Sequence, residues 1–238
     1  MKNTLMWDGV DLEYLANKYG TPLYVYSVSA MEDKINQLKK AFIEKYPKAR
    51  IAYASKAFLN KAMVGLIKSQ GLSLDAVSLG ELQIALKAGM DAQDIEFNGN
   101  NKLHSELEYA IKHRVGRIIV DSKEELEYIE RFGRQYNYRV PVLFRVTPGI
   151  NINSHKYIIT GSKDSKFGLP LDDSLVPHLK RVLESDYMDF YGFHFHLGSQ
   201  LMDNHTYLQS LELVFEFIDK YLENKLIKEL NIGGGGWH

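Results

Sequence analysis

The even spacing of short apolar runs along this chain constrains its fold more than any other feature. From residue 50 onward a strand-like run recurs about every 22 residues, and a helical pattern fills each gap. The runs begin near Ile51, Leu72, Ile95, Arg117 and Val140, and two later ones cover 188–197 and 229–232. Repeated strand–helix units predict a parallel sheet, and the even period favours a (β/α) barrel over a doubly wound sheet.

The count of predicted strands is seven, whereas a closed barrel of this class has eight. The expected fold is therefore an α/β, TIM-type (β/α)8 barrel that is incomplete. Helices are predicted at 61–69, 79–88, 105–113, 123–136 and 204–224, and before the barrel at 11–19 and 31–46, with a strand at 21–26. The long irregular stretch 147–170 is a candidate active-site loop.

Composition narrows the classes of function. The chain has 238 residues, 45% hydrophobic and 25% charged, as is usual for a globular protein. A net charge of −1 without a long basic run argues against nucleic acid or a membrane surface as partner. No spanning apolar run or signal peptide is evident, so a cytoplasmic location is expected. The absence of cysteine excludes disulfides and cysteine chemistry supplied by these residues.

Lys56 follows the first strand of the predicted barrel, in the run RIAYASKA of residues 50–57. Chemistry in such barrels gathers at the carboxyl ends of the strands. We expect the apolar surroundings to bury Lys56, which favours the neutral amine that can hold an aldehyde as a Schiff base. The alternative is a lysine that caps the next helix or extends to water.

Other strand ends bring further chemistry to the same edge. Asp75 and Arg145 are expected there, and an internal ion pair between them is the simplest interpretation. His194 and His196 are two residues apart and share a strand face, so they could bind a metal, stack on a flat cofactor or pack as structural side chains. No third ligand is evident in sequence beside them, which ranks the metal last.

A glycine run follows the last predicted strand. Gly233, Gly234 and Gly235 can present backbone N–H groups to a phosphate because no Cβ blocks close approach. The hydroxyl of Ser199 can add to the same anion. A flexible tail is the alternative interpretation of the run.

Several motifs in order resemble the PLP-dependent ornithine/diaminopimelate/arginine decarboxylase family, whose barrel is of the alanine-racemase type. They are GTPLYVY (20–26), YASKA (53–57), LDAVSLGEL (74–82), FNGNNK (97–102), SKFG (165–168), HFHLGSQ (194–200) and NIGGG (231–235). The loop HKYIITG (155–161), with Gln200 after the Gly-Ser pair, favours the diaminopimelate branch.

The resemblance implies roles for the residues above. Lys56 would be the lysine that binds pyridoxal 5′-phosphate, and His196 would stack on its ring. Ser199 and the three glycines would hold the phosphate, and Asp75 and Arg145 would support the lysine. The implied catalytic residues are Lys56 and His196, and no metal is implied.

The sequence departs from the family after the glycine run. The family continues with an eighth strand that carries a Glu-Pro-Gly-Arg motif and with a C-terminal β domain, and its members are homodimers. We therefore expect residues 1–30 to be a segment that pairs with that β domain, and residues 31–238 to be a barrel truncated before strand eight.

The expected function is PLP-dependent decarboxylation of meso-2,6-diaminopimelate to L-lysine and CO₂, the last step of lysine biosynthesis. These 238 residues alone are expected to be inactive, because the carboxylate partner of the pyridine nitrogen and the cysteine acid are missing. The alternatives are a non-catalytic PLP-binding barrel and a metal-dependent barrel hydrolase that uses His194 and His196.

Overall fold

The computed structural model describes residues 5–149, 167–198, 204–222 and 226–234. The chain divides into two compact units, Met1–Ile51 and Ala52–His238. No helix in the described part is both long and apolar enough to cross a membrane.

The N-terminal unit contains a short hairpin and two helices. In chain order they are β1 (Met6–Trp7), β2 (Val10–Asp11), α1 (Leu12–Tyr19) and α2 (Val28–Leu38), which continues into a π-helical turn, Lys39–Ile43. Asp8 and Gly9 both have positive φ, which is the geometry of a two-residue hairpin turn. The Asp11 side chain begins α1 by accepting a hydrogen bond from the Glu13 N–H at 2.8 Å.

The predicted strand at 21–26 is wrong, since these residues belong to no strand in the described structure. A strand is stable only when a neighbour satisfies its backbone hydrogen bonds, and the apolar pattern alone does not supply that neighbour.

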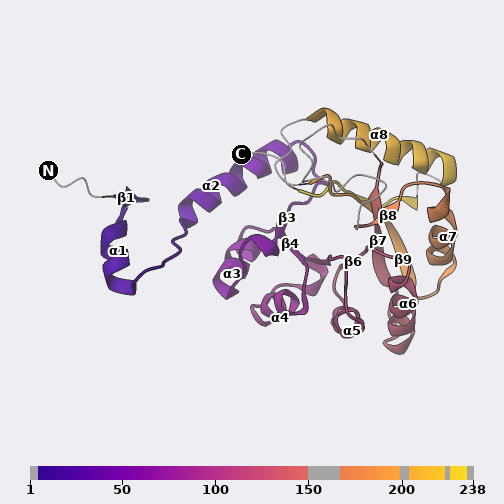
Figure 1. The fold of residues 1–238 in the computed structure, drawn as a ribbon, viewed down its shortest axis with the longest axis horizontal. Helices are drawn as coiled ribbons and strands as arrows, with labels where there is room; N and C mark the ends of the chain where they lie inside the picture. Colours follow the sequence, from indigo (N-terminus) through magenta and orange to yellow (C-terminus); the bar gives the residue numbers. More distant parts are fainter. Residues whose placement is uncertain (1–4, 150–166, 199–203, 223–225, 235–238) are drawn as a thin grey trace. The chain divides into compact units, whose positions relative to one another are not determined.

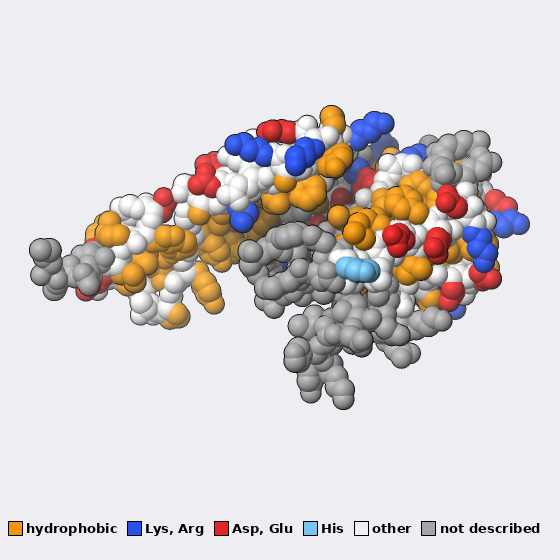
Figure 2. All heavy atoms as spheres, turned by 90° about the horizontal axis from the view of Figure 1, so that it is seen from above, with side chains coloured by type: hydrophobic (Ala, Val, Ile, Leu, Met, Phe, Trp, Pro, Cys, Tyr) orange, Lys and Arg blue, Asp and Glu red, His pale blue; other side chains and the backbone are white. Residues whose placement is uncertain are grey.

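Hydrophobic side chains are exposed on the N-terminal unit, as Figure 2 shows. Helix α1 has no buried residue and α2 buries only Ile35. Trp7, Tyr14 and Tyr24 are among its exposed large side chains. Burial within this unit therefore contributes little to its stability.

The second unit is built on a parallel sheet. Its strands are β3 (Ala52–Ala54), β4 (Ser73–Ala76), β5 (Ile95–Phe97), β6 (Arg117–Val120), β7 (Val140–Thr147), β8 (Leu169–Pro170), β9 (Met188–His194) and β10 (Glu229–Asn231). Seven of them follow the order β10-β9-β7-β6-β5-β4-β3, and the short β8 pairs with β7 outside that path. The predicted seven parallel strands are confirmed.

Helices connect successive strands and lie around the outside of the sheet, as Figure 1 shows. They are α3 (Lys61–Ser69), α4 (Leu79–Lys87), α5 (His104–Lys112), α6 (Glu125–Gln135), α7 (Val176–Glu184) and α8 (Asn204–Tyr221), with short 3-10 turns at Ser55–Ala57, Ala92–Asp94 and Asp173–Leu175. All were predicted from the sequence pattern except α7 and the 3-10 turns. Helix α7 is only nine residues long and buries just Leu179 and Val182, which is a weak periodic signal.

Side-chain contacts across the concave face show that the sheet is strongly curved. Asn231 on β10 donates to Glu96 on β5 at 2.8 Å, although three strands lie between them. Glu229 on β10 pairs with Arg117 on β6 at 2.5 Å. Such contacts require the two sides of the sheet to approach each other, as in a (β/α) barrel.

Candidate functional site

The carboxyl ends of the parallel strands bring the predicted site residues to one edge. Lys56 lies in the turn that follows β3, and the neighbouring Ser55 hydroxyl donates to the backbone oxygen of Asp75 at 2.8 Å. Ala54 is in register with Asp75 on β4. This turn therefore holds Lys56 beside the end of β4.

The predicted burial of Lys56 is wrong. Strand β3 is only half-buried, and Lys56 is exposed. β3 pairs with β4 alone in the described sheet, so atoms cover it from one side only. The amine is consequently accessible to a molecule that enters the barrel mouth.

Asp75 carries a perturbed carboxyl group. Its Oδ1 is shielded from solvent and has no hydrogen-bond partner in the described structure. Burial raises the pKa of Asp75 to about 6, while a hydrogen bond from Asn98 and the charge of Lys56 act against that rise. A buried carboxylate oxygen without a partner is costly unless another group uses it.

Arg145 pairs with Asp121 rather than with Asp75, which corrects the predicted ion pair. Its Nη1 lies 3.1 Å from Asp121 Oδ1, and both side chains are buried. Burial lowers the pKa of Arg145, and Asp121 opposes this shift. The charge of Arg145 still acts on Asp75 and lowers its pKa.

Both predicted histidines are neutral at physiological pH. His194, the last residue of β9, is in register with Arg145, and burial followed by the Arg145 charge lowers its pKa to about 3. His196 is half-buried two residues further on, and burial followed by the Lys56 charge lowers its pKa to about 4. In the described chain, no group of three or more His, Cys, Asp or Glu side chains could hold a metal ion.

The glycine turn after β10 packs against His196. Gly233 has φ +72°, and a Cβ there would lie 2.5 Å from the Phe195 oxygen and 3.1 Å from His196 Nδ1. The Gly234 N–H donates weakly to His196 Nδ1 at 3.4 Å. Ser199, Gly235 and most of the predicted loop 147–170 lie outside the described residues.

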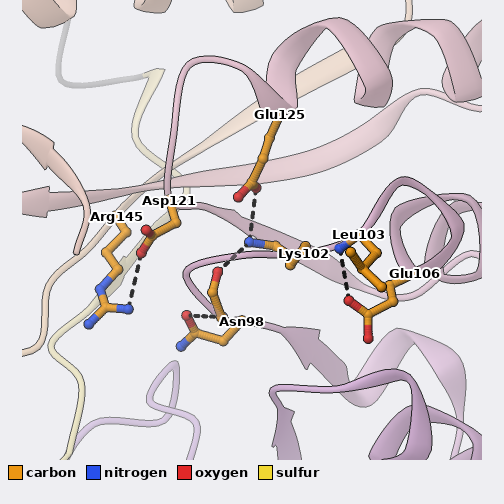
Figure 3. Close-up of polar contacts among 8 residues, drawn as sticks. Asn98, Lys102, Leu103, Glu106, Asp121, Glu125 and Arg145 are labelled. Carbon is orange, nitrogen blue, oxygen red and sulfur yellow. Dashed lines mark hydrogen bonds and ion pairs between the residues drawn. The ribbon is translucent and has the colours of Figure 1, made fainter. Parts of the chain in front are cut away.

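Two buried ion pairs lie next to the site, and of their four residues only Arg145 had an assigned role in the sequence analysis (Figure 3). One pair joins Lys102, after β5, to Glu125, at the start of α6, and the other is the Arg145–Asp121 pair. Lys102 ends the FNGNNK motif, so its position was visible in the sequence. Nothing in the local pattern marks Glu125, because an acidic residue in the first turn of a helix is common.

The fold and the strand-end residues define a class of protein: a (β/α) barrel domain with an accessible lysine, a perturbed aspartate, neutral histidines and a glycine turn at one edge. Residues 30–236 match the family model described as the pyridoxal binding domain of pyridoxal-dependent decarboxylases. The chain belongs to this family.

The most similar relatives include diaminopimelate decarboxylases. The enzyme of Bacillus subtilis is 43% identical over 230 residues, covering 95% of this chain and 52% of the relative. That of Methanocaldococcus jannaschii is 35% identical, covering 96% and 53%. The crystal structure of the M. jannaschii enzyme matches with a TM-score of 0.88 at 34% identity. The match covers 99% of this chain and 56% of the chain in that structure. A second structure of that enzyme contains L-lysine. The chain thus spans about half the length of these relatives.

The residues present fit pyridoxal phosphate. A flat aldehyde with an anionic tail needs an accessible amine, a planar neighbour and backbone donors close by. Lys56 is an accessible amine, and the His196 ring is neutral. The missing Cβ of Gly233 lets the glycine turn pack directly against Phe195 and His196. Asp75 has an Oδ1 without a hydrogen-bond partner in the described structure, and the charge of Lys56 acts on its carboxyl group.

Proposed function

We propose that this chain binds pyridoxal 5′-phosphate on Lys56 and serves the decarboxylation of meso-2,6-diaminopimelate to L-lysine and CO₂. One observation carries the proposal: the Lys56 amine lies at the accessible end of β3, where its charge acts on both Asp75 and His196. The match to the pyridoxal-binding family model and the names of the relatives support the choice of cofactor and substrate.

Each site residue has a proposed role toward the cofactor. Lys56 supplies the amine that binds the aldehyde. The Oδ1 of Asp75 can accept a hydrogen bond from that amine, since it has no other partner in the described structure. His196 offers the face of a neutral ring. Ser199 and the glycine turn of Gly233, Gly234 and Gly235 hold the phosphate. The Gly233 N–H donates to Asn231 Oδ1 at 2.9 Å and the Gly234 N–H weakly to His196 Nδ1 at 3.4 Å, so either donor would exchange that partner for the phosphate.

The cofactor supplies an electron sink when bound, and the chain supplies orientation and charge. Asp75 is ionised above pH 6, so it can stabilise the ammonium form of Lys56 or take up a proton at Oδ1. Arg145 limits the rise in the pKa of Asp75 through its charge, and Asp121 holds Arg145 in place. Phe193 and Phe195 alternate with the two histidines, and Phe193 packs on Phe217 of α8, so they hold this part of the chain against the helix layer from the other face of the sheet.

The wider assembly is also a proposal. Residues 1–30 are inferred to pair with a C-terminal β domain of the kind that the family carries, and residues 31–238 to form the cofactor barrel. Exposed hydrophobic side chains within residues 1–30, such as Trp7, Tyr14 and Tyr24, support a partner for that segment, whereas the compact units of the structure divide later, between Ile51 and Ala52. A homodimer and a cytoplasmic location follow from the same resemblance, and the L-lysine complex of the M. jannaschii relative supports an amino-acid substrate.

An activity assay tests the proposal. Purified chain is incubated with pyridoxal phosphate and meso-diaminopimelate, and L-lysine is measured, alone and after addition of the C-terminal half of a full-length relative. We expect slow turnover by these 238 residues alone and a gain on addition, because a general acid typically contributes about 10²–10⁴-fold and they contain no cysteine to act as one. Cofactor bound to Lys56 without turnover in either sample would favour the non-catalytic barrel. Metal-dependent hydrolysis without cofactor binding would favour the hydrolase.

A further inference from the structure

A buried ion pair lies beyond β5 and β6, among residues with no role in the proposal above. Lys102 Nζ is 2.9 Å from Glu125 Oε2, and the two side chains are 1% and 7% exposed. The same Nζ donates to the backbone oxygen of Gly99 at 2.7 Å (Figure 3). Desolvation makes a buried ion pair a poor source of stability, so its position calls for another explanation.

Lys102 holds a turn that is packed against the end of β4. The Asn98 N–H donates to the Ala76 oxygen at 2.8 Å, and the Asn98 side chain accepts from the Gly99 N–H at 2.9 Å. Gly99 has φ +117°, and a Cβ there would lie 3.3 Å from the Val77 oxygen. Two contacts therefore fix this turn, one to β4 and the other to the Lys102 ammonium.

The 98–99 turn places the Asn98 side chain at the candidate site. Asn98 directly follows Phe97, which is in register with Ala76, so the buried Asn98 side chain lies next to Asp75 and lowers the pKa of its carboxyl group. We propose that Lys102, held by Glu125, is a positioning residue that fixes the 98–99 turn and so keeps the Asn98 side chain on the Asp75 carboxylate beside Lys56. The inference rests on the proposed function, in which Asp75 supports Lys56.

The influence of Lys102 on Asp75 runs through the turn and not through its charge. The largest charge effects on Asp75 come from Lys56 after β3, Glu81 on α4 and Arg145 on β7. The ammonium of Lys102 faces the Glu125 carboxylate, so the charges of this pair largely cancel at Asp75. A variant that removes both charges of the pair therefore leaves the electrostatic potential at Asp75 almost unchanged. It removes the hydrogen bond from Lys102 to the Gly99 oxygen and so loosens the 98–99 turn.

The test is the titration of Asp75 followed by carboxyl ¹³C NMR in the full 238-residue chain. Lys102→Met/Glu125→Gln keeps the side-chain lengths and removes both charges. We expect the pKa of Asp75 to rise by about one pH unit, the size expected for losing a hydrogen bond to a carboxylate. Asn98→Ala should give the same rise, and adding it to the double variant should give no further rise.

Lys68→Met is the matched control, since Lys68 Nζ also donates to a glycine oxygen at 2.7 Å, that of Gly89, at the opposite end of the strands. It should leave the Asp75 titration unchanged. An unchanged titration in the folded double variant, or a further rise on adding Asn98→Ala, would overturn the proposal. If the double variant fails to fold, Lys102→Gln/Glu125→Gln, which also removes both charges and the ammonium donor, takes its place under the same criteria.

A second readout separates this inference from the proposed function. Each chain is treated with pyridoxal phosphate and borohydride, and the adduct on Lys56 is quantified by mass spectrometry over time. We expect slower labelling in Lys102→Met/Glu125→Gln and wild-type labelling in Lys68→Met. If the wild-type chain carries no adduct on Lys56, the proposed function fails, and the Asp75 titration still decides the role of Lys102.

Discussion

Buried His194 makes the stability of the barrel sensitive to acid. Its pKa is about 3 in the folded chain, mainly because of burial, whereas the ordinary value is 6.5. As the pH falls below 6.5 the unfolded chain binds a proton that the folded chain does not. The stability associated with neutral His194 is therefore complete above pH 6.5 and is lost progressively as the pH falls toward 3.

The variant His194→Gln should flatten this dependence. Between pH 6 and 4, we expect the free energy of urea unfolding of the wild type to fall more steeply than that of the variant, by up to about 1.4 kcal/mol for each pH unit. Asp75, whose pKa is raised, contributes the opposite slope below pH 6 in every variant. His113→Gln, at an exposed position, should retain the wild-type slope. Equal slopes for His194→Gln and wild type would contradict the assignment.

Gly233 and Gly234 are adjacent but differ in what a side chain would meet. Gly233→Ala would place Cβ 2.5 Å from the Phe195 oxygen at φ +72°, whereas a Cβ at Gly234 meets nothing within 4 Å. We expect Gly233→Ala to lower the free energy of unfolding by about 1–3 kcal/mol and to weaken cofactor binding. Gly234→Ala should change stability by less than about 0.5 kcal/mol. Equal losses, measured by urea unfolding, would show that the turn tolerates a side chain at Gly233.

Some of the candidate site residues could be predicted from the sequence and others could not. The glycine run, Lys56 and the two histidines were recognisable, since their types and spacing are local. The exposure of Lys56 and the Arg145–Asp121 pair were predicted wrongly. Both depend on which strands are neighbours and on the tilt of side chains across the sheet, and neither is encoded in a local pattern.

At the scale of single elements, helices α3 to α6 were predicted within two residues, whereas the helices predicted at 31–46 and 204–224 differ by three residues or more from α2 (Val28–Leu38) and α8 (Asn204–Tyr221) at one end or both. The hairpin β1–β2 was missed, although Asp8-Gly9 between apolar residues is a known signal for such a turn. The strand predicted at 21–26 failed for the opposite reason, because a propensity without a neighbouring strand does not make a sheet.

One glutamate links two neighbouring helix starts. Glu106 accepts from the Leu103 N–H at 2.8 Å, which begins α5, and from the Leu79 N–H at 3.0 Å, which begins α4. We expect Glu106→Ala to lower the free energy of unfolding by about 1–3 kcal/mol, because two backbone donors lose their partner.

Glu127→Ala is the control for the first-turn charge of Glu106. Glu127 is also an acidic residue in the first turn of a helix, but it is exposed. Its loss should cost less than about 1 kcal/mol. Thermal and urea unfolding that give the same loss for both variants would refute the linking role of Glu106.

At the scale of the whole molecule, the parallel order of seven strands was predictable because each strand–helix unit repeats a local pattern. The contacts across the concave face, such as Asn231 with Glu96, were not predictable from that pattern. They join residues 135 positions apart, and they require the curvature that only the assembled sheet provides.

Covalent labelling can show whether Lys56 is the residue at which this chain binds pyridoxal phosphate. The chain is incubated with pyridoxal phosphate, reduced with borohydride and digested, and the adduct is located by mass spectrometry. We expect one dominant adduct on Lys56, lost in Lys56→Arg and unchanged in Lys61→Arg, which replaces an exposed lysine five residues away. Labelling spread over surface lysines, with Lys56 unmodified, would contradict it.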